Sequence, residues 1–163
     1  MTSQGAEELI SVLEEQETRL VLESFTHDDA WRLGVLLVET ARERGAPVAI
    51  DIRSASQQLF HYALPGSSAN NDAWIDRKRR VVERYGASSF LVAARYRARG
   101  TTFDESSRLD LDRYAAHGGS FPLRVRAVGA GTVGTVSVSG LAQEDDHALI
   151  VEVLERFVAS QRG

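Results

Sequence analysis

The chain has 163 residues, of which 43% are hydrophobic and 26% are charged, and its formal net charge at pH 7 is −4. This length and composition are typical of one soluble globular domain, which we expect to span residues 1–163. The chain contains no cysteine, which excludes disulfides, thiolate nucleophiles and cysteine-ligated metals. No run approaches the roughly 18 apolar residues of a membrane span, and the acidic N-terminal stretch differs from a signal peptide. We therefore predict a cytoplasmic protein without a membrane partner.

The first third of the chain has the pattern of helix, strand and helix. We expect a helix over residues 6–18, a strand over 19–25 and a second helix over 28–44. The second helix carries apolar side chains on two sides: Trp31, Val35 and Val38 on one, and Leu33, Leu36 and Leu37 on the other. A helix of this kind is covered on both sides, here by the sheet and by another helix or subunit. The pattern therefore predicts a homo-oligomer, because exposed apolar patches mark interfaces.

Two hairpins dominate the remainder of the chain. Residues 47–53 and 57–64 alternate in polarity around a three-residue loop, and strands over 121–128 and 132–139 flank a turn at 129–131. The other elements that we expect are helices over 74–85, 88–99 and 143–160, a loop over 65–72 and irregular chain over 100–120. With the strand over 19–25, the sheet has five strands and is largely antiparallel, with helices packed against it. This arrangement is an α+β fold.

A basic segment stands out in this acidic chain. Residues 74–99 contain eight Arg or Lys side chains against Asp76 and Glu83. Such a segment collects anions, or it forms a solvated helix face or an ion-paired surface between subunits. Nucleic acid is an unsuitable partner for a protein with a pI of about 5.6.

The four histidines match no metal-binding spacing, so no metal site is predicted. His27 stands at a helix entrance, where we expect it to be solvated. His61 has the strand parity of its apolar neighbours and is either a core histidine or a pocket residue. Asp146 and His147 should both face the sheet at the start of the last helix. A carboxylate beside an imidazole is a general-base pair in enzymes, or else a helix cap beside a semi-buried histidine.

The run His117-Gly118-Gly119 precedes a predicted strand. The two glycines allow backbone amides to approach a ligand closely, or they provide a sharp turn into the strand. We expect a pocket rim here, with His117 placed for binding, the start of the last helix facing the same region and the cluster 77–80 favouring an anion.

Several motifs together resemble a known family. The stretches "GGSFPLRV" and "GTVGTVSVSGL", followed by Asp146 in the last helix, are similar to the heme-degrading domain family, which includes GlcG-like proteins and the C-terminal domain of PduO. "FHYALPGSSANNDAWIDRKRRVVERYG" and "YAAHGGSFPL" resemble one bacterial and fungal branch of that family. The resemblance covers roughly residues 7–160. The residues that match the motifs are Gly118, Gly119, Pro122, Gly134, Val138, Ser139, Gly140 and Asp146.

The resemblance implies a profilin-like arrangement, with a central antiparallel sheet between helices, assembled into ring-like or layered oligomers. It implies a ligand site near the His-Gly-Gly run, with heme or a related tetrapyrrole as a possible cofactor and heme degradation as a possible activity. His61, His117 and His147 are then candidate iron ligands, and residues 77–80 could pair with the propionates. A non-catalytic oligomeric scaffold that holds a small anion is the alternative, and the sequence leaves this choice open. The candidate ligand-binding residues are His61, Arg77, Lys78, Arg80, His117, Gly118, Gly119, Asp146 and His147.

Overall fold

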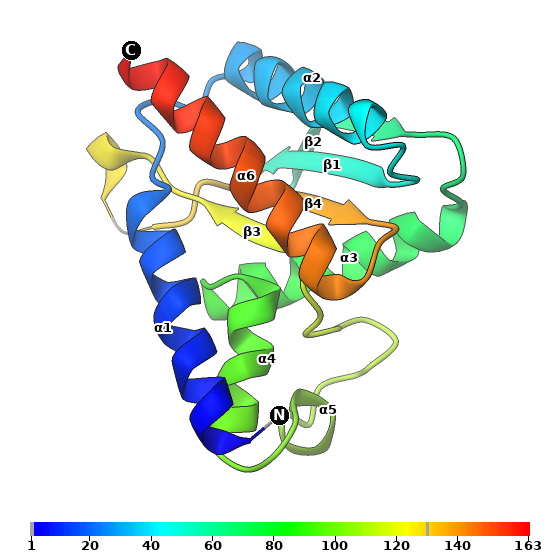
Figure 1. Cartoon of the computed structure of the whole chain (residues 1–163), viewed down its shortest axis with the longest axis vertical. Helices are drawn as coiled ribbons and strands as arrows, with labels where there is room; N and C mark the ends of the chain where they lie inside the picture. Colours follow the sequence, from blue (N-terminus) through cyan, green and yellow to red (C-terminus); the bar gives the residue numbers. More distant parts are fainter. Residues whose placement is uncertain (1, 130) are drawn as a thin grey trace.

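A four-stranded antiparallel sheet with strand order β2-β1-β4-β3 forms the centre of the protein. We describe it from a computed structural model of residues 2–129 and 131–163 (Figure 1). The strands are β1 (Ala49–Ser54), β2 (Gln57–Ala63), β3 (Ser120–Leu123) and β4 (Gly134–Ser139). The α-helices are α1 (Ser3–Arg19), α2 (His27–Glu43), α3 (Ala69–Tyr85), α4 (Ser89–Ala98), α5 (Phe103–Ser106) and α6 (Gln143–Arg162). The α+β class with an antiparallel sheet is thus confirmed.

The two faces of the sheet differ in polarity. Paired residues point to the same face, and the pairs Ile50↔Val138 and Ile52↔Val136 make one face apolar. Helices α2 and α6 pack side by side over this face (Figure 1) and complete the main core. The pair Asp51↔Ser137 lies on the opposite face, which is polar although these residues are buried. Helix α3 covers the polar face, where it meets β3 and β4.

A second, smaller core lies beside the sheet. Helices α1, α4 and α5 gather below the sheet in Figure 1. Their apolar side chains, among them Leu13, Leu91 and Phe103, form a cluster separate from the main core. The sequence pattern predicts α1 and α4, but it misses α5, which lies in the segment 100–120 expected to be irregular, and it does not predict this second packing centre.

The prediction of a fifth strand over residues 19–25 is wrong. Within the described residues this segment makes one parallel bridge, between Leu22 and Val125. Two other backbone groups of the segment bond to a side chain of α6: Glu23 N–H donates to Gln161 Oε1, and the carbonyl of Ser24 accepts from Gln161 Nε2. A side chain of α6 therefore takes the place of a strand ladder.

Several expected boundaries also shift. The strand expected over 121–128 ends at Leu123, and residues 126–128 form a 3₁₀ turn, because β4 pairs with β3 only as far as Gly134. Residue 130, inside the expected turn 129–131, lies outside the described residues. The first hairpin has a two-residue turn, since Ser54 pairs with Gln57, and Ala55 takes a left-handed φ of 50°.

Helix α3 starts earlier than expected, within the segment expected to be a loop over 65–72. Ser68 and Asn71 form a reciprocal capping box that begins the helix at Ala69. The early start brings Asn70 and Asn71 onto the helix, next to the candidate site.

Candidate functional site

A polar recess of about 210 Å³ lies where the first half of α3, the His117-Gly118 segment, the end of β4 and the start of α6 converge. Its lining residues are Asn70, Asn71, Trp74, Lys78, His117, Gly118, Ser139, Gly140, Leu141, Gln143 and Asp146. The recess lies beside the His-Gly-Gly run, and it brings together four of the candidate residues: Lys78, His117, Gly118 and Asp146.

Lys78, the only lysine of the chain, forms the floor of the recess. Its Nζ donates to the carbonyl oxygens of Val138 at 2.7 Å and Gly118 at 3.1 Å, and it lies 3.4 Å from Asp146 Oδ2. Asp146 also accepts a hydrogen bond from Leu141 N–H at 2.9 Å. Burial raises the pKa of Asp146 and lowers the pKa of Lys78, in each case against the attraction between the two charges. One buried ion pair therefore fastens α3, β4 and α6 together.

The two glycines of the His-Gly-Gly run are required by close packing around this ion pair. Gly119 has a φ of 125°, and a Cβ there would come closer than 3.0 Å to Lys78 Nζ and to the carbonyl oxygen of Val138. A Cβ on Gly118 would come equally close to the carbonyl oxygen of Gln143 on α6. The amide of Gly118 donates to Gln143 Oε1 at 3.0 Å, so it has a partner within the protein.

Two aromatic rings form the side wall of the recess. The rings of Trp74 and His117 lie 5.1 Å apart, edge to face, at an interplanar angle of 61°. His117 is half-buried, and burial lowers its pKa, so the imidazole is neutral at pH 7. The wall is therefore aromatic and uncharged.

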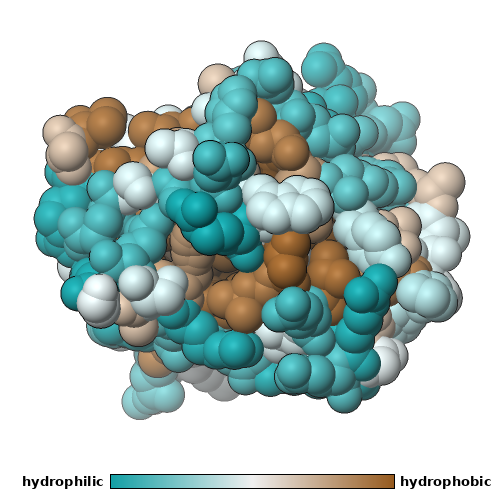
Figure 2. Space-filling model, turned by 90° about the horizontal axis from the view of Figure 1, so that it is seen from above, coloured by the Kyte–Doolittle hydropathy of each residue, from teal (hydrophilic) through white to brown (hydrophobic). Residues whose placement is uncertain are grey.

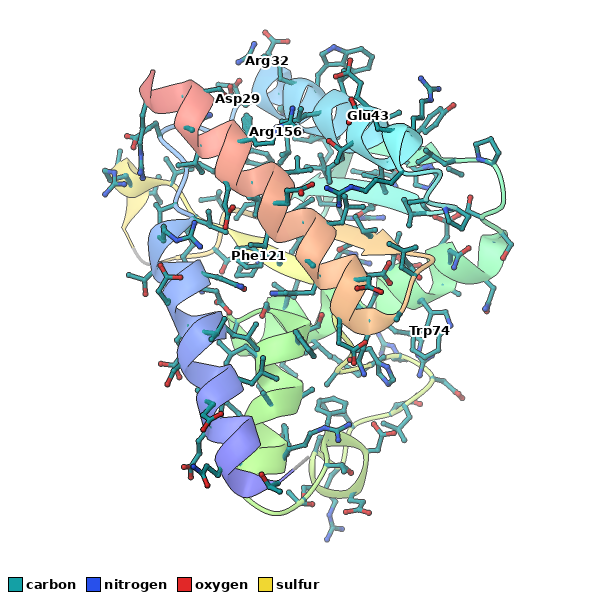
Figure 3. All side chains as sticks on the ribbon, viewed as in Figure 1. Asp29, Arg32, Glu43, Trp74, Phe121 and Arg156 are labelled. Carbon is teal, nitrogen blue, oxygen red and sulfur yellow. The ribbon has the colours of Figure 1, made fainter. Side chains whose placement is uncertain are left out.

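The arginines of α3 hold the segment 107–117 that carries His117. Arg77 Nε donates to the carbonyl oxygen of Leu111 at 3.0 Å, and Arg80 donates to that of Arg113 at 3.2 Å. Arg77 also stacks on Trp74, with its Cζ 4.4 Å from the ring centre. Figure 3 shows Trp74 projecting from α3 toward this segment. Arg77 and Arg80 thus lie outside the lining of the recess, and Arg77 supports its aromatic wall from behind.

Asp146 and His147 are neighbours in sequence but belong to different environments. His147 Nε2 lies 2.8 Å from Gln16 Oε1 of α1, and its ring packs between Phe90 and Phe121. Burial lowers its pKa to about 4, and its Nδ1 has no hydrogen-bond partner among the described residues. This histidine links the main core to the second core and does not pair with Asp146 as a general base would.

His61 lies at a different place, on the edge strand β2. Its Nε2 is 2.7 Å from Asp72 Oδ1 of α3, and its side chain is 35% exposed. It borders a second polar recess of about 280 Å³ that includes Asp51 and Arg53. His61, Arg77, Arg80 and His147 are therefore not part of the recess beside His117.

Sequence reasoning did not select Trp74, Asn70, Asn71, Ser139 or Gln143 as site residues. The spacing of Trp74 and Lys78 contains a usable signal, because residues four apart share one face of a helix. Ser139 and Gln143 approach the recess only through the turn between β4 and α6. Within the described part of the chain, no helix is long and apolar enough to cross a membrane, and no three His, Asp or Glu side chains are grouped to hold a metal.

The fold and the recess define an α+β domain whose glycine-rich strand entrance closes over a buried Lys–Asp pair. The chain belongs to the family described as "Haem degrading protein HbpS-like", whose sequence model matches residues 25–155. The resemblance to the heme-degrading domain family is thus confirmed.

Relatives and solved structures agree with this assignment. The chain is 66% identical to a UPF0303 protein of Streptomyces avermitilis over 97% of this chain and 96% of that protein. It is 46% identical to a UPF0303 protein of Edwardsiella ictaluri over 94% of this chain and 97% of that one. The crystal structure of Ybr137w protein superposes with a TM-score of 0.86 at 33% identity, over 94% of this chain and 90% of the other. A PduOC:heme complex, at 16% identity, shares the fold with a TM-score of 0.67, over 83% of this chain and 95% of the other.

Proposed function

We propose that the recess beside His117 and Trp74 binds a small, planar, polar molecule without net charge. The observation that carries the proposal is the charge of its walls. Among the described residues, the ionic side chains that line it are Lys78 and Asp146, and these two neutralise each other. A further net charge would be desolvated there without a free counter-charge. A wall of two aromatic rings, with amide side chains lining the same recess, suits a planar molecule that carries an amide or a similar donor–acceptor group.

Each wall has a distinct part in the proposed binding. The rings of Trp74 and His117 contact the face or edge of the ligand, while the side-chain amides of Asn70 and Gln143 offer hydrogen bonds at the mouth. The buried Lys78–Asp146 pair fixes the three elements that carry these groups. Among the described residues, His117 has no carboxylate partner within hydrogen-bond distance, so we propose binding without turnover.

The recess by itself would not enclose a whole tetrapyrrole. Pockets that enclose drug-sized ligands measure about 300–1,000 Å³, and the recess is smaller than that range. The heme-bound neighbour is only 16% identical, so its ligand does not carry over with the shared fold. We therefore derive no heme chemistry from this site.

Three probes test the proposal: benzamide, benzoate and hemin. Benzamide and benzoate match in size and differ in charge, and the indole N–H of Trp74 reports on the recess in ¹⁵N-labelled protein. A Trp31→Phe variant leaves Trp74 as the single indole signal, since the chain has two tryptophans.

We expect saturable shifts of the Trp74 indole signal with benzamide and weaker ones with benzoate. Stronger binding of benzoate would support the small-anion alternative, and a saturable Soret shift with hemin would support tetrapyrrole binding. The absence of a saturable shift with any of the three probes would favour the scaffold alternative and contradict the proposal.

We also propose that the protein is a homo-oligomer. The support is the outer side of α2, where Trp31 remains 63% exposed although the sheet covers the opposite side of the helix. Light scattering should give a mass at least twice the 17.9 kDa of one chain. A mass of one chain that persists on concentration would contradict this part of the proposal.

A further inference from the structure

The free edge of the sheet has little protection against pairing with another strand beyond one register shift in the β1–β2 ladder, opposite Ile52 and Arg53. Strand β2 is the outermost strand, and Gln57–Ala63 contains neither a charged residue nor a proline. Natural edge strands are commonly protected by such residues. Leu64 N–H donates to the carbonyl of Val48. Because residues of an antiparallel strand bond alternately to one side and to the other, this bond fixes which residues of β2 bond to β1. The backbone groups of His61 and Ala63 therefore point away from β1, toward the free edge.

An apolar groove runs beside this edge. Trp31, Val35 and Val38 of α2 and Leu59, Phe60 and Tyr62 of β2 line a cavity of about 400 Å³, together with the polar residues Glu39, Arg42 and His61. The ring of Phe60 packs against the backbone of α2 at Gly34, where a Cβ would collide with it, and the ring of Trp31 lies 5.9 Å away. Figure 2 views the molecule from the side of α2 and α6 and shows hydrophobic side chains in a hollow surrounded by hydrophilic ones. The groove combines exposed aromatic surface with an unpaired strand, which is typical of an interface.

The two ends of the groove complement each other. Helix α2 and strand β2 run in the same direction, because Trp31 meets Phe60 at one end and Arg42 meets Tyr62 at the other. A twofold axis near His61 would reverse one copy relative to the other. It would bring Trp31 of one copy toward Arg42 of the partner subunit, and a guanidinium is attracted to an indole face. An edge strand is also complementary to itself in antiparallel pairing, since donors and acceptors alternate in the same way on both copies.

We propose that a second copy of this chain docks on the groove through antiparallel pairing of the two β2 strands about a twofold axis near His61. The pairing joins the two sheets into one continuous sheet and covers Trp31 and Tyr62. This inference rests on the homo-oligomer part of the proposed function and names the surface that it uses.

A cysteine substitution tests the geometry directly. The chain has no cysteine, so His61→Cys introduces a single thiol near the axis. Antiparallel partners lie about 4.5–5.5 Å apart at Cα, within the range of about 4.4–6.8 Å that a disulfide spans. We expect most of the His61→Cys protein to form a disulfide-linked dimer under mild oxidation. Val12→Cys, at a residue of α1 that is 54% exposed, is the control and should form little. Equal cross-linking of the two variants would overturn the proposal.

Charge substitutions in the groove provide a second test. Trp31→Glu and Tyr62→Glu place a carboxylate in the interface and should weaken the dimer about tenfold or more in light scattering, whereas Val12→Glu should leave it unchanged. Circular dichroism and benzamide binding by the recess show whether each variant is folded. An oligomer that persists in both groove variants would overturn this interface and leave the homo-oligomer proposal intact. A monomeric wild-type protein would overturn both proposals. If the groove binds an unrelated protein and no second copy of this chain, the choice of partner would be overturned.

Discussion

Lys78 Nζ lies 3.4 Å from Asp146 Oδ2, and the two side chains are only 2% and 4% exposed. The chain's single lysine is thus removed from water, although lysine is among the residues least often buried. Burial moves the pKa of both groups toward neutralisation, which shows that desolvation outweighs their mutual attraction. The pair therefore contributes to the relative position of α3, β4 and α6 more than to net stability.

Removing the lysine should strongly destabilise the protein. Lys78→Met leaves the buried carboxylate of Asp146 without its counter-charge and two buried carbonyl oxygens without the ammonium donor. Breaking a buried pair costs about 3–5 kcal/mol, and we expect a loss of this size in the free energy of unfolding by urea. Arg19→Met removes exposed pairs with Glu15 and Glu155 and should cost about 1 kcal/mol or less.

The double variant Lys78→Met/Asp146→Leu separates pairing from packing. Removing both charges should recover part of the loss, because no buried charge then remains unpaired. The recovery should be incomplete, since Leu141 N–H loses its acceptor. If the loss of unfolding free energy in the double variant equals the sum of the losses in Lys78→Met and Asp146→Leu, the two side chains are not directly coupled.

The sequence predicts elements better than it predicts partners. Alternation locates β1 and β2, and the spacing of Trp74 and Lys78 places both on one face of α3. The burial of Lys78 depends on carbonyl groups 40 and 60 residues away, which no local pattern encodes. The failure of the strand over 19–25 has the same origin, because Gln161 reaches Glu23 across 138 residues. His147 could be predicted to point inward, but its contact with Gln16 could not, since these residues are 131 apart.

His147 should make the protein sensitive to mild acid. Its pKa is about 4 in the folded protein, below the ordinary value of 6.5, because burial disfavours the charged ring. The unfolded chain therefore binds a proton at a higher pH than the folded protein does. Stability is complete above pH 6.5 and falls as the pH decreases toward 4, with a total loss of about 3 kcal/mol from this group. Urea denaturation at a series of pH values measures the slope.

His147→Phe isolates this contribution. The ring keeps its place between Phe90 and Phe121 and loses its proton-binding site. The variant should be less stable at pH 7, since Gln16 loses a partner, but its stability should fall less between pH 6.5 and 4.5. Carboxylates titrate in both proteins and cancel in the comparison. Parallel pH profiles would show that His147 does not remain neutral in the folded protein.

Three glycine substitutions should rank by backbone angle and available space. Gly131→Ala meets nothing within 4 Å and should change stability little. Gly45→Ala also has space, but its φ of 61° should cost about 1 kcal/mol. Gly119→Ala combines a φ of 125° with a collision against Lys78 and Val138, and it should cost the most, on the order of 3 kcal/mol. Thermal unfolding of the three variants checks the order. A small loss of stability in Gly119→Ala would mean that the side chain of Lys78 can shift to make room for the new methyl group.

His117→Ala should separate binding from folding at the recess. The imidazole is half-buried and contacts Trp74 edge to face, a pair worth about 0.5–1.5 kcal/mol. It donates no structural hydrogen bond within the described residues, unlike the neighbouring Gly118 amide. We therefore expect the free energy of unfolding to fall by about 1 kcal/mol, while the affinity for benzamide falls about tenfold or more because half of the aromatic wall is gone. His27→Ala, at an exposed position where α2 begins, should affect neither quantity. Unchanged benzamide affinity in a folded His117→Ala protein would place the ligand elsewhere, whereas a large loss of stability would make His117 a packing residue of the segment 107–117.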